Sequence, residues 1–343
     1  MKKVCYLTNC ITNLGGIERV ISTHSFAFEK DGTIDLTILS LNSKPGQNSS
    51  FQFSPSTKII HCGFPFESNC DDFLIDFFQK NKFDTLVTFH SPIAHTVARL
   101  RKKLPPMRLV MTEHCSPRDY TWKRQLLNLY VYRKADKFVV LINDSARYYR
   151  RFGFRGVLVV PNPVSFTSDK CSDYNKVILA VGRIEEVKRY DLLVEAFGRI
   201  ADKYPDWTLR IVGHGTQQET VRKLAEPYKN IEFQNFSDDV KSLMLDASFL
   251  AISSTFEGFP MVAVEALECG LPIVSTKLPA IASMTQGTNS ALFAEQNDPA
   301  DLADKIEQLI LDPGLVREMG RQAKQCALQY RPEVIVERWK EIF

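Results

Sequence analysis

Short runs of β-branched and other apolar residues alternate with helix-like segments along the whole chain. This alternation is typical of parallel sheets, in which a helix connects each strand to the next. It stops at Pro161–Pro163 and the polar stretch Ser165–Asn175, and then begins again. We therefore expect two doubly wound α/β domains in tandem, because 343 residues exceed the usual size of one domain, about 100–150 residues.

The expected strands form two sets, one on each side of this linker. The first set is Val4–Thr8, Asp35–Ser40, Lys58–His61, Thr85–Phe89, Arg108–Thr112, Phe138–Ile142 and Val157–Val160. The second set is Val177–Val181, Thr208–Val212, Ile231–Gln234, Phe249–Ser253, Pro272–Ser275 and Ala291–Phe293. Open α/β sheets bind ligands beyond the carboxyl ends of their strands, so we expect a ligand in a central cleft between the two domains.

The composition excludes several classes of protein. Hydrophobic residues make up 44% of the chain, which is too many for a disordered protein. No apolar run approaches the ~20 residues that span a bilayer, and Val4–Asn9 is too short for a signal sequence. The eight cysteines form no Cys-x-x-Cys pair, and the six histidines lack the spacing of metal ligands. The sequence therefore predicts a cytoplasmic protein with reduced thiols and no metal site.

The net charge of +3 conceals two halves of opposite sign. Residues 1–165 hold 23 Lys and Arg against 13 Asp and Glu, whereas residues 166–343 hold 20 against 27. In Arg147–Arg155, cations are mixed with aromatic residues, which suits an anionic bilayer surface, although a solvated basic face accounts for the charge equally well. We expect no nucleic-acid partner, because no helix-turn-helix, zinc-finger or RNP motif accompanies the charge.

Two strand-to-helix loops of the first half carry candidate ligand-binding groups. Gly15 and Gly16 precede a helix expected over Ile17–Phe28, where backbone amides could approach an anion or a sugar hydroxyl, or where a tight turn alone needs glycine. The motif is not G-x-G-x-x-G, which counts against a nicotinamide or flavin site. His90 and His114 follow two strands; each could donate to a sugar hydroxyl or simply be structural.

In the second half, the loop Gly182–Lys188 places Arg183 and Lys188 near the end of one strand. Two fixed cations can stabilise the charge on a departing pyrophosphate without a metal. The alternative is that both are solvated, or paired with Glu185 and Glu186. A helix from about residue 189 to 202 is expected to follow.

The loop Ser254–Pro260 and the helix expected over Met261–Cys269 form the most informative segment. Pro260 suits the first helical turn, and the amides of Gly258, Phe259 and Met261 could donate to an oxygen-rich ligand. The carboxylate of Glu265 could accept both hydroxyl protons of a ribose, and Glu257 could contact a hexose. The alternative for Glu265 is an ordinary glutamate on the helix surface.

These loops together resemble the retaining GT-B glycosyltransferases of the family-4 type. The resemblance is carried by Val181-Gly182-Arg183 with Lys188, by Val212–Gly215, and by Glu257–Leu267, which is similar to the E-x7-E motif of that family. Gly15-Gly16, Glu113-His114 and Pro161–Pro163 match it in the first half. The fold implied is two Rossmann-like domains facing a central cleft. Residues 1–165 would bind the acceptor, residues 166–331 would bind the nucleotide sugar, and the helix 332–343, anchored by Trp339, would pack back on the first domain.

The resemblance also implies roles for individual residues. Arg183 and Lys188 would hold the nucleotide diphosphate, and Glu265 the ribose hydroxyls. The donor sugar would be oriented by Glu257 and by the following segment Gly258, Phe259, Pro260, Met261 and Val262, and Gly16 would lie where the phosphate meets the acceptor. His114 would contact the C6 region of the sugar, and the acceptor would lie near Gly15, Gly16, His90 and His114.

The implied reaction keeps the anomeric configuration and needs neither metal nor cofactor. Glu257, His114, Lys188 and Arg183 would form its catalytic set. The donor expected is a UDP-linked hexose or N-acetylhexosamine, because the Phe-Pro-Met-Val form of the loop is similar to that of enzymes using UDP-sugars. GDP-mannose stays open, since Gly213–Thr216 and Asn235–Asp238 contain no residue that selects the base.

The acceptor expected is a glycan or a polyprenyl-diphosphate-linked saccharide in bacterial surface polysaccharide synthesis, such as capsule or lipopolysaccharide. The basic first half would hold the enzyme peripherally on the inner face of the cytoplasmic membrane. The alternatives are a non-hydrolysing UDP-sugar epimerase on the same fold and a scaffold that binds sugar nucleotides without catalysis.

Overall fold

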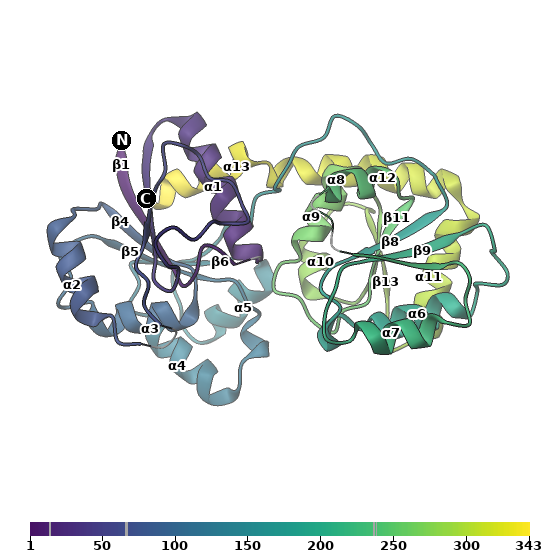
Figure 1. Ribbon diagram of the computed structural model, residues 1–343, viewed down its shortest axis with the longest axis horizontal. Coiled ribbons are helices and arrows are strands. Elements are labelled where there is room, and N and C mark those ends of the chain that lie inside the picture. The colour runs from purple at the N-terminus through teal and green to yellow at the C-terminus, as the bar shows by residue number, and fades with distance from the viewer. Residues whose placement is uncertain (14, 66–67, 236, 238) are drawn as a thin grey trace. The chain divides into compact units, whose positions relative to one another are not determined.

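The computed structural model describes residues 1–13, 15–65, 68–235, 237 and 239–343. Over these residues the chain divides into two compact units, which we call unit 1 (Met1–Ser165 with Tyr330–Phe343) and unit 2 (Phe166–Gln329). In this described part, unit 1 contains a parallel sheet of seven strands and unit 2 one of six (Figure 1). The predicted α/β class with two doubly wound sheets is confirmed.

The strand order in unit 1 is β3-β2-β1-β4-β5-β6-β7. Its strands are β1 (Lys2–Thr8), β2 (Ile34–Ser40), β3 (Lys58–His61), β4 (Thr85–Thr88), β5 (Arg108–Glu113), β6 (Lys137–Val140) and β7 (Val157–Val159). Its helices are α1 (Gly16–Asp31), α2 (Asp71–Lys80), α3 (Ser91–Leu100), α4 (Trp122–Tyr132), α5 (Asn143–Arg151) and α13 (Pro332–Ile342).

Both faces of the unit 1 sheet are buried. Successive side chains of a strand point to opposite faces, and in β1 Val4 and Tyr6 join one apolar cluster whereas Cys5 and Leu7 join another. The first cluster includes residues of α1 and α13, and the second includes residues of α2, α3, α4 and α5 (Figure 1). Burial on both faces is what a parallel sheet with crossover helices requires.

The helix α13 completes the first of these clusters. Trp339 is 3% exposed, and its ring lies 5.6 Å from that of His24 on α1. The Lys340 ammonium lies 2.9 Å from Asp31 at the end of α1, and Arg108 of β5 donates to the carbonyl oxygen of Phe343 at 2.8 Å. The chain therefore supplies one face of the unit 1 core from segments that are more than 300 residues apart, as Lys340 and Asp31 are separated by 309.

The strand order in unit 2 is β10-β9-β8-β11-β12-β13. Its strands are β8 (Val177–Val181), β9 (Thr208–Val212), β10 (Ile231–Gln234), β11 (Phe249–Ile252), β12 (Ile273–Thr276) and β13 (Ala291–Ala294). Its helices are α6 (Tyr190–Gly198), α7 (Gln218–Ala225), α8 (Val240–Leu245), α9 (Met261–Glu268), α10 (Pro279–Met284), α11 (Pro299–Leu311) and α12 (Pro313–Ala327). None of the described helices of either unit combines the length and the apolarity that a membrane crossing requires.

Every predicted strand is present, and its ends lie within two residues of those predicted. Three details of the helices were predicted wrongly. The helix predicted over Ile17–Phe28 continues to Asp31. The helix expected to reach residue 202 ends at Gly198, where a Cβ atom would overlap the ring of Tyr228. This position needs glycine, which has a low helix propensity, and the chain continues in turns. Pro260 precedes α9 as its N-cap, with ψ of 107°, and is not part of its first turn.

Candidate functional site

The candidate site of unit 2 lies at the carboxyl ends of β8 and β11. These two strands are neighbours in the sheet, but β8 connects onward to β9 on one side and β11 to β12 on the other. Such a change of direction leaves a crevice between the loops, and it is where open α/β sheets bind their ligands. Arg183 and Lys188 follow β8, and Glu257 follows β11.

Hydrogen bonds fix these two loops to one another. The Ser253 hydroxyl donates to the carbonyl oxygen of Lys188 at 2.8 Å, and the Thr255 amide donates to that of Val187 at 2.9 Å. Thr276 at the end of β12 donates to the carbonyl oxygen of Ser254 at 2.7 Å. The backbone of Lys188 is therefore held in place before any ligand binds.

The side chain of Lys188 pairs with Glu257. Its Nζ atom lies 2.6 Å from Glu257 Oε1, which also accepts a hydrogen bond of 2.8 Å from the Ser254 hydroxyl. The two side chains are 22% and 12% exposed, so the pair is partly desolvated. Burial, reinforced by the Glu257 carboxylate, raises the pKa of the neighbouring Tyr190 hydroxyl, which stays protonated.

The pairing of Lys188 with Glu185 or Glu186, which the sequence left open, is wrong. Glu185 accepts hydrogen bonds from Thr216, at 2.6 Å from its hydroxyl and 3.3 Å from its amide. These bonds lower the pKa of the Glu185 carboxyl, and the charge of Arg183 adds a smaller contribution. Arg183 itself is exposed at the end of β8, where its guanidinium can meet a ligand.

Gly182 and Gly213 allow the loops after β8 and β9 to come very close. Both have positive φ values, 154° and 144°, and a Cβ atom on Gly213 would overlap the carbonyl oxygen of Gly182. The Ile184 amide then donates to the carbonyl oxygen of His214 at 2.9 Å. Glycine is needed at 213 for this approach. Of the other predicted base-contacting loop, Asn235–Asp238, residues 236 and 238 lie outside the described residues.

The helix α9 begins directly after the loop Ser254–Pro260 and carries two buried glutamates, Glu265 and Glu268. Glu265 is 1% exposed, so the alternative of a glutamate on the helix surface is wrong. Glu268 is fully buried and accepts a hydrogen bond of 3.0 Å from the Ser168 amide. The first amides of a helix have no partner within it, so Met261 and Val262 present donors at the positive end of the helix dipole.

Gly258 and Phe259 belong to the turn that leads into α9. Gly258 is half-buried, whereas Phe259 is 9% exposed and anchors the turn. The structure thus brings Lys188, Glu257 and the start of α9 to one edge of the unit 2 sheet.

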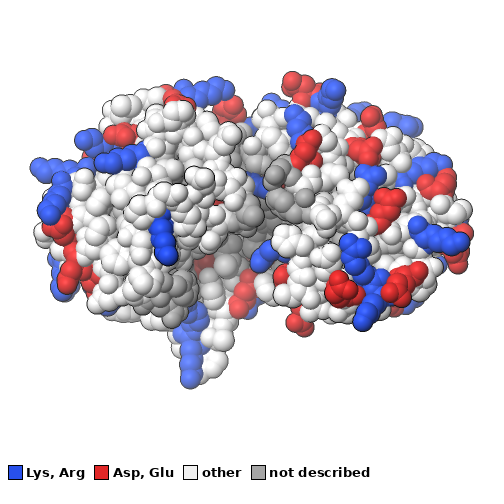
Figure 2. All heavy atoms as spheres, in the orientation of Figure 1, with Lys and Arg blue, Asp and Glu red and all other residues white. Residues whose placement is uncertain are grey.

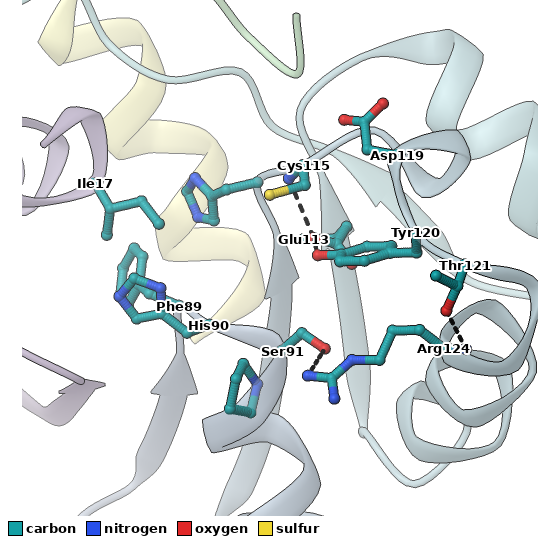
Figure 3. Close-up of a pocket in the computed structure, with 12 residues that line it drawn as sticks. Ile17, Phe89, His90, Ser91, Glu113, Cys115, Asp119, Tyr120, Thr121 and Arg124 are labelled. Carbon is teal, nitrogen blue, oxygen red and sulfur yellow. Dashed lines mark hydrogen bonds between the residues drawn. The ribbon is translucent and has the colours of Figure 1, made fainter. Parts of the chain in front are cut away.

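A second candidate site lies in unit 1, at a cavity of about 510 Å³ beyond the carboxyl ends of β4 and β5. In Figure 3, Ile17, Phe89 and His90 lie on one side of this cavity, and Tyr120, Thr121 and Arg124 lie on the other. The strand order changes direction between β1 and β4, and the cavity is also lined by Ile17, which follows β1, so it occupies the corresponding position in the unit 1 sheet.

His90 and His114 both line this cavity. His90 Nε2 lies 3.2 Å from the Thr8 hydroxyl, and His114 Nε2 lies 3.0 Å from the Thr112 hydroxyl. Burial lowers the pKa of His90 to about 4 and that of His114 to about 3, where the charges of His90 and His24 add to the effect. Both rings are therefore neutral near pH 7 and can serve as hydrogen-bonding groups.

Gly15 and Gly16 open the helix α1, of which Gly15 is the N-cap. The Glu18 carboxylate folds back over Gly15, so that a Cβ atom there would collide with it. The atoms of Glu18 that a Cβ would meet are the far end of a flexible side chain, and Gly15 has an extended backbone (φ −132°, ψ 167°) that any residue adopts, so the geometry does not require glycine at this position. Gly16 is the first residue of the helix, and Ile17 next to it reaches the cavity.

The sequence analysis did not predict the hydrogen-bond network around Glu113, which lines this cavity. Glu113 is 3% exposed and accepts hydrogen bonds from the hydroxyls of Tyr132 at 2.6 Å and Tyr120 at 3.0 Å, and from the Cys115 amide at 3.1 Å (Figure 3 shows the last). Burial raises the pKa of this carboxyl, although the hydrogen bonds oppose the shift. The only signal in the sequence was a carboxylate at the end of a buried strand.

Comparison with known proteins decides the family. Residues 167–326 match the sequence family described as Glycosyl transferases group 1, and residues 14–167 match the one described as Glycosyltransferase Family 4. Together the two matches cover residues 14–326, and both identify the chain as a glycosyltransferase. The epimerase alternative finds no support in these comparisons.

Two relatives of this glycosyltransferase align with it over its whole length. An uncharacterized glycosyltransferase of Haemophilus influenzae is 28% identical over 358 residues, covering 100% of both chains. The amylovoran biosynthesis glycosyltransferase AmsD of Erwinia amylovora is 25% identical over 361 residues, covering 100% of this chain and 99% of the relative.

Two solved structures resemble this glycosyltransferase in fold. A variant of TarM from S. aureus, in complex with fondaparinux, α-GlcNAc-glycerol and UDP, has a TM-score of 0.82 at 14% identity, covering 100% of this chain and 99% of TarM. HepE from Anabaena, in complex with UDP, has a TM-score of 0.79 at 18% identity, covering 99% of both chains. At these identities the likeness concerns the fold alone, which is the GT-B fold expected from the sequence.

Proposed function

We propose that this glycosyltransferase moves a hexose or N-acetylhexosamine from a UDP-linked donor to a saccharide acceptor with retention of the anomeric configuration. The observation that carries the proposal is the arrangement in unit 2, where the Lys188–Glu257 pair and the start of α9 follow the two strands at which the sheet changes direction. The exposed guanidinium of Arg183 follows the same strand as Lys188.

In this proposal the donor's diphosphate binds beside Arg183 and Lys188. The ammonium of Lys188 is held by Glu257, and its backbone is held by Ser253, so the charge is positioned before the reaction. A preorganised cation stabilises developing negative charge far better than a mobile one, because little reorganisation is needed in the transition state. Arg183 can bind a phosphate in the bidentate manner of a guanidinium.

The ribose and the donor sugar are assigned to α9 and the loop before it. Glu265 would accept the protons of the two ribose hydroxyls, and its burial makes such hydrogen bonds stronger than in water. The amides at the start of α9, from Met261 and Val262, would donate to the donor's oxygens. Glu257 has a second carboxylate oxygen beside the one that Lys188 and Ser254 contact, and it could accept from a sugar hydroxyl.

Retention follows if the acceptor hydroxyl attacks the anomeric carbon on the face from which the diphosphate leaves. The bond from the anomeric carbon to the diphosphate oxygen breaks, the bond to the acceptor oxygen forms, and the acceptor proton passes to the departing phosphate. This route requires no protein nucleophile. We propose that Arg183 and Lys188 meet the departing charge in the place of a metal ion.

The UDP assignment is supported by the relatives, since the TarM and HepE structures are both complexes with UDP. A role in bacterial surface polysaccharide synthesis is supported by the amylovoran biosynthesis glycosyltransferase, which matches over the full length. The acceptor proposed is a glycan or a polyprenyl-diphosphate-linked saccharide, bound by the basic unit 1 near His90 and His114. We place the enzyme at the inner face of the cytoplasmic membrane.

A panel of nucleotide sugars tests the donor, since a ligand that binds the folded state raises the melting temperature. We expect UDP-sugars to stabilise the protein and GDP-mannose not to; the reverse result would overturn the UDP assignment. With the donor known, NMR of the product's anomeric proton tests retention, and an inverted product would contradict the mechanism. Turnover should be unchanged by EDTA, and a loss restored by Mg²⁺ would refute metal independence.

A further inference from the structure

The helix α4 exposes an unusual set of large apolar side chains. Among the described residues, Trp122 is 67% exposed, Leu126 57%, Leu127 44% and Tyr130 61%. The opposite side of the same helix, with Leu129, Val131 and Tyr132, is buried in the unit 1 core. The exposed residues therefore form a second apolar face, which the fold of unit 1 does not need.

The spacing of these residues makes the exposed face continuous. Trp122, Leu126 and Tyr130 are four residues apart and lie above one another on the helix, with Leu127 beside them. We call this set the α4 stripe. An apolar stripe on one side of a helix is what allows a helix to lie in the surface layer of a bilayer, with Trp and Tyr at the level of the headgroups.

Cations flank the α4 stripe, and the nearest acidic residues in the sequence, Asp119 and Asp136, lie just beyond its two ends. Between residues 120 and 135 the sequence contains Lys123, Arg124, Arg133 and Lys134 but no Asp or Glu. Lys123 Nζ lies 5.6 Å from the ring centre of Trp122, and Lys134 Nζ lies 4.6 Å from that of Tyr130. Figure 2 shows Lys and Arg side chains next to uncharged ones at the end of unit 1 where Figure 1 draws α4.

The aromatic residues of Arg147–Arg155, by contrast, mostly face inward. Tyr149 is 1% exposed in the core, and the Tyr148 hydroxyl donates to Gln125 of α4 at 2.7 Å. Only the cations of this segment, with Phe152, add to the surface beside α4. Tyr149 is therefore not available to a bilayer, and most of the exposed apolar surface here comes from α4.

We propose that the α4 stripe docks unit 1 onto a bilayer that contains anionic lipid. Trp122, Leu126 and Tyr130 enter the headgroup region, and the ammonium and guanidinium groups of Lys123, Arg133 and Lys134 bind lipid phosphates. The inference deepens the proposed function and rests on it for the acceptor. Thr121 and Arg124 line the unit 1 cavity from the same stretch of chain, so docking brings that cavity to the surface where a lipid-linked saccharide is presented.

The charges around the α4 stripe favour a bilayer, rather than a second copy of the chain, as the surface that covers it. In a symmetric dimer the same patch faces itself, so the cations Lys123, Arg133 and Lys134 of both copies would be gathered into one interface. Like charges across an interface are unfavourable. An anionic lipid surface satisfies both the stripe and the cations.

Flotation with lipid vesicles tests the proposal. We expect the whole protein to float with vesicles of phosphatidylcholine and phosphatidylglycerol but not with phosphatidylcholine alone, and less so as salt is raised. The double variant Leu126→Ser/Tyr130→Ser should partition at least ~10-fold more weakly. Lys123→Gln should weaken partitioning ~5-fold. The matched control Leu224→Ser/Leu311→Ser replaces two exposed leucines of unit 2, 48% and 64% exposed, and should float like the wild type.

Trp122 provides a built-in probe for the same experiment. The three tryptophans are all described, and Trp207 and Trp339 are each 3% exposed. Fluorescence that shifts to the blue with anionic vesicles, and is quenched by brominated lipid, therefore reports on Trp122. Unquenched fluorescence, or equal flotation of the Leu126→Ser/Tyr130→Ser variant, would overturn the proposal.

Light scattering and sugar-transfer assays distinguish membrane docking from dimer formation and from a loss of catalysis. If the wild type is a dimer by light scattering, does not float, and becomes a monomer in the double variant, the stripe is a dimer interface and the proposal is wrong. With a soluble acceptor saccharide, the double variant should turn over as fast as the wild type, while transfer to a vesicle-embedded acceptor falls. Vesicle binding without any sugar transfer would instead count against the proposed function alone.

Discussion

The Nζ atom of Lys188 lies 2.6 Å from Oε1 of Glu257, although the two residues are 69 positions apart. This ion pair joins the loops after β8 and β11, the two strands between which the unit 2 sheet changes direction. Because both side chains are largely buried, each charge depends on the other for compensation. The pair is thus both a structural link and the proposed anchor of the departing diphosphate.

The first prediction concerns this ammonium. Replacing Lys188 by Ala should slow turnover by about 100-fold and weaken UDP binding, because the developing charge loses a preorganised partner. Initial rates and calorimetric titration with UDP measure both effects. Lys203→Ala is the matched control, since the Lys203 ammonium lies 2.7 Å from Glu307 at an exposed site and should leave both values unchanged. Wild-type kinetics in Lys188→Ala would refute the assignment.

Glu265→Gln tests the ribose contact. The amide keeps the size of the side chain but loses one acceptor oxygen, so we expect the apparent KM for the donor to rise about 10-fold, the value of one charge-assisted hydrogen bond. The KM for the acceptor should not change. Glu268→Gln removes the other buried carboxylate of α9, which contacts the Ser168 amide, and should lower the melting temperature without changing the donor KM. An effect of Glu265→Gln on acceptor kinetics alone would contradict the ribose role.

His114→Ala should impair transfer while the affinity for free UDP stays as in the wild type. The neutral imidazole of His114 is proposed to contact the donor sugar, which free UDP lacks. Rates with the complete donor and titrations with UDP distinguish the two effects. A large loss of UDP binding would show that His114 acts elsewhere or supports the fold.

The buried histidines of unit 1 should make it sensitive to acid. Burial lowers the pKa of His24 to about 3, whereas an unfolded histidine titrates near 6.5. Below that value the unfolded chain binds a proton that the folded chain excludes, so the free energy of unfolding falls as the pH drops from about 6.5 towards 3. The raised pKa of Glu113 acts in the opposite direction, because its protonated form is favoured in the folded state.

His24→Gln should reduce this sensitivity. Glutamine takes up no proton and can still contact the Tyr6 hydroxyl, which lies 3.2 Å from His24 Nδ1. Between pH 7 and pH 5 we expect the variant to lose about 2 kcal/mol less free energy of unfolding than the wild type does. Urea unfolding at the two pH values, followed by circular dichroism, measures the difference. Equal losses in both proteins would show that His24 does not carry the acid response.

The strands could be predicted from the sequence because parallel strands are buried on both faces and appear as continuous apolar runs. Lys58–His61, Val177–Val181 and Thr208–Val212 were predicted with their observed bounds. The order of the strands is not encoded in any one run. The partner of Lys188 was therefore missed, since Glu185 and Glu186 are near it in sequence, whereas Glu257 is brought near only by the neighbouring strand.

The surface was harder to predict than the core. Tyrosines 148 and 149 have the same side chain as Tyr130, yet only Tyr130 lies on an exposed face. A tyrosine can fill a core or lie at an interface, and packing of the whole unit decides between them. In the same way, nothing in the sequence distinguished the buried Glu265 from a solvated glutamate on a helix.

The position of α13 bears on how the protein is made. Ribosomes synthesise chains from the N-terminus, and domains that are continuous in sequence fold as they emerge. One face of the unit 1 sheet, however, packs against Ile335 and Trp339, which are translated only after every residue of unit 2. The earliest strands must therefore keep an apolar surface uncovered while the second unit is synthesised, and this period is when the nascent chain is most open to chaperones or aggregation.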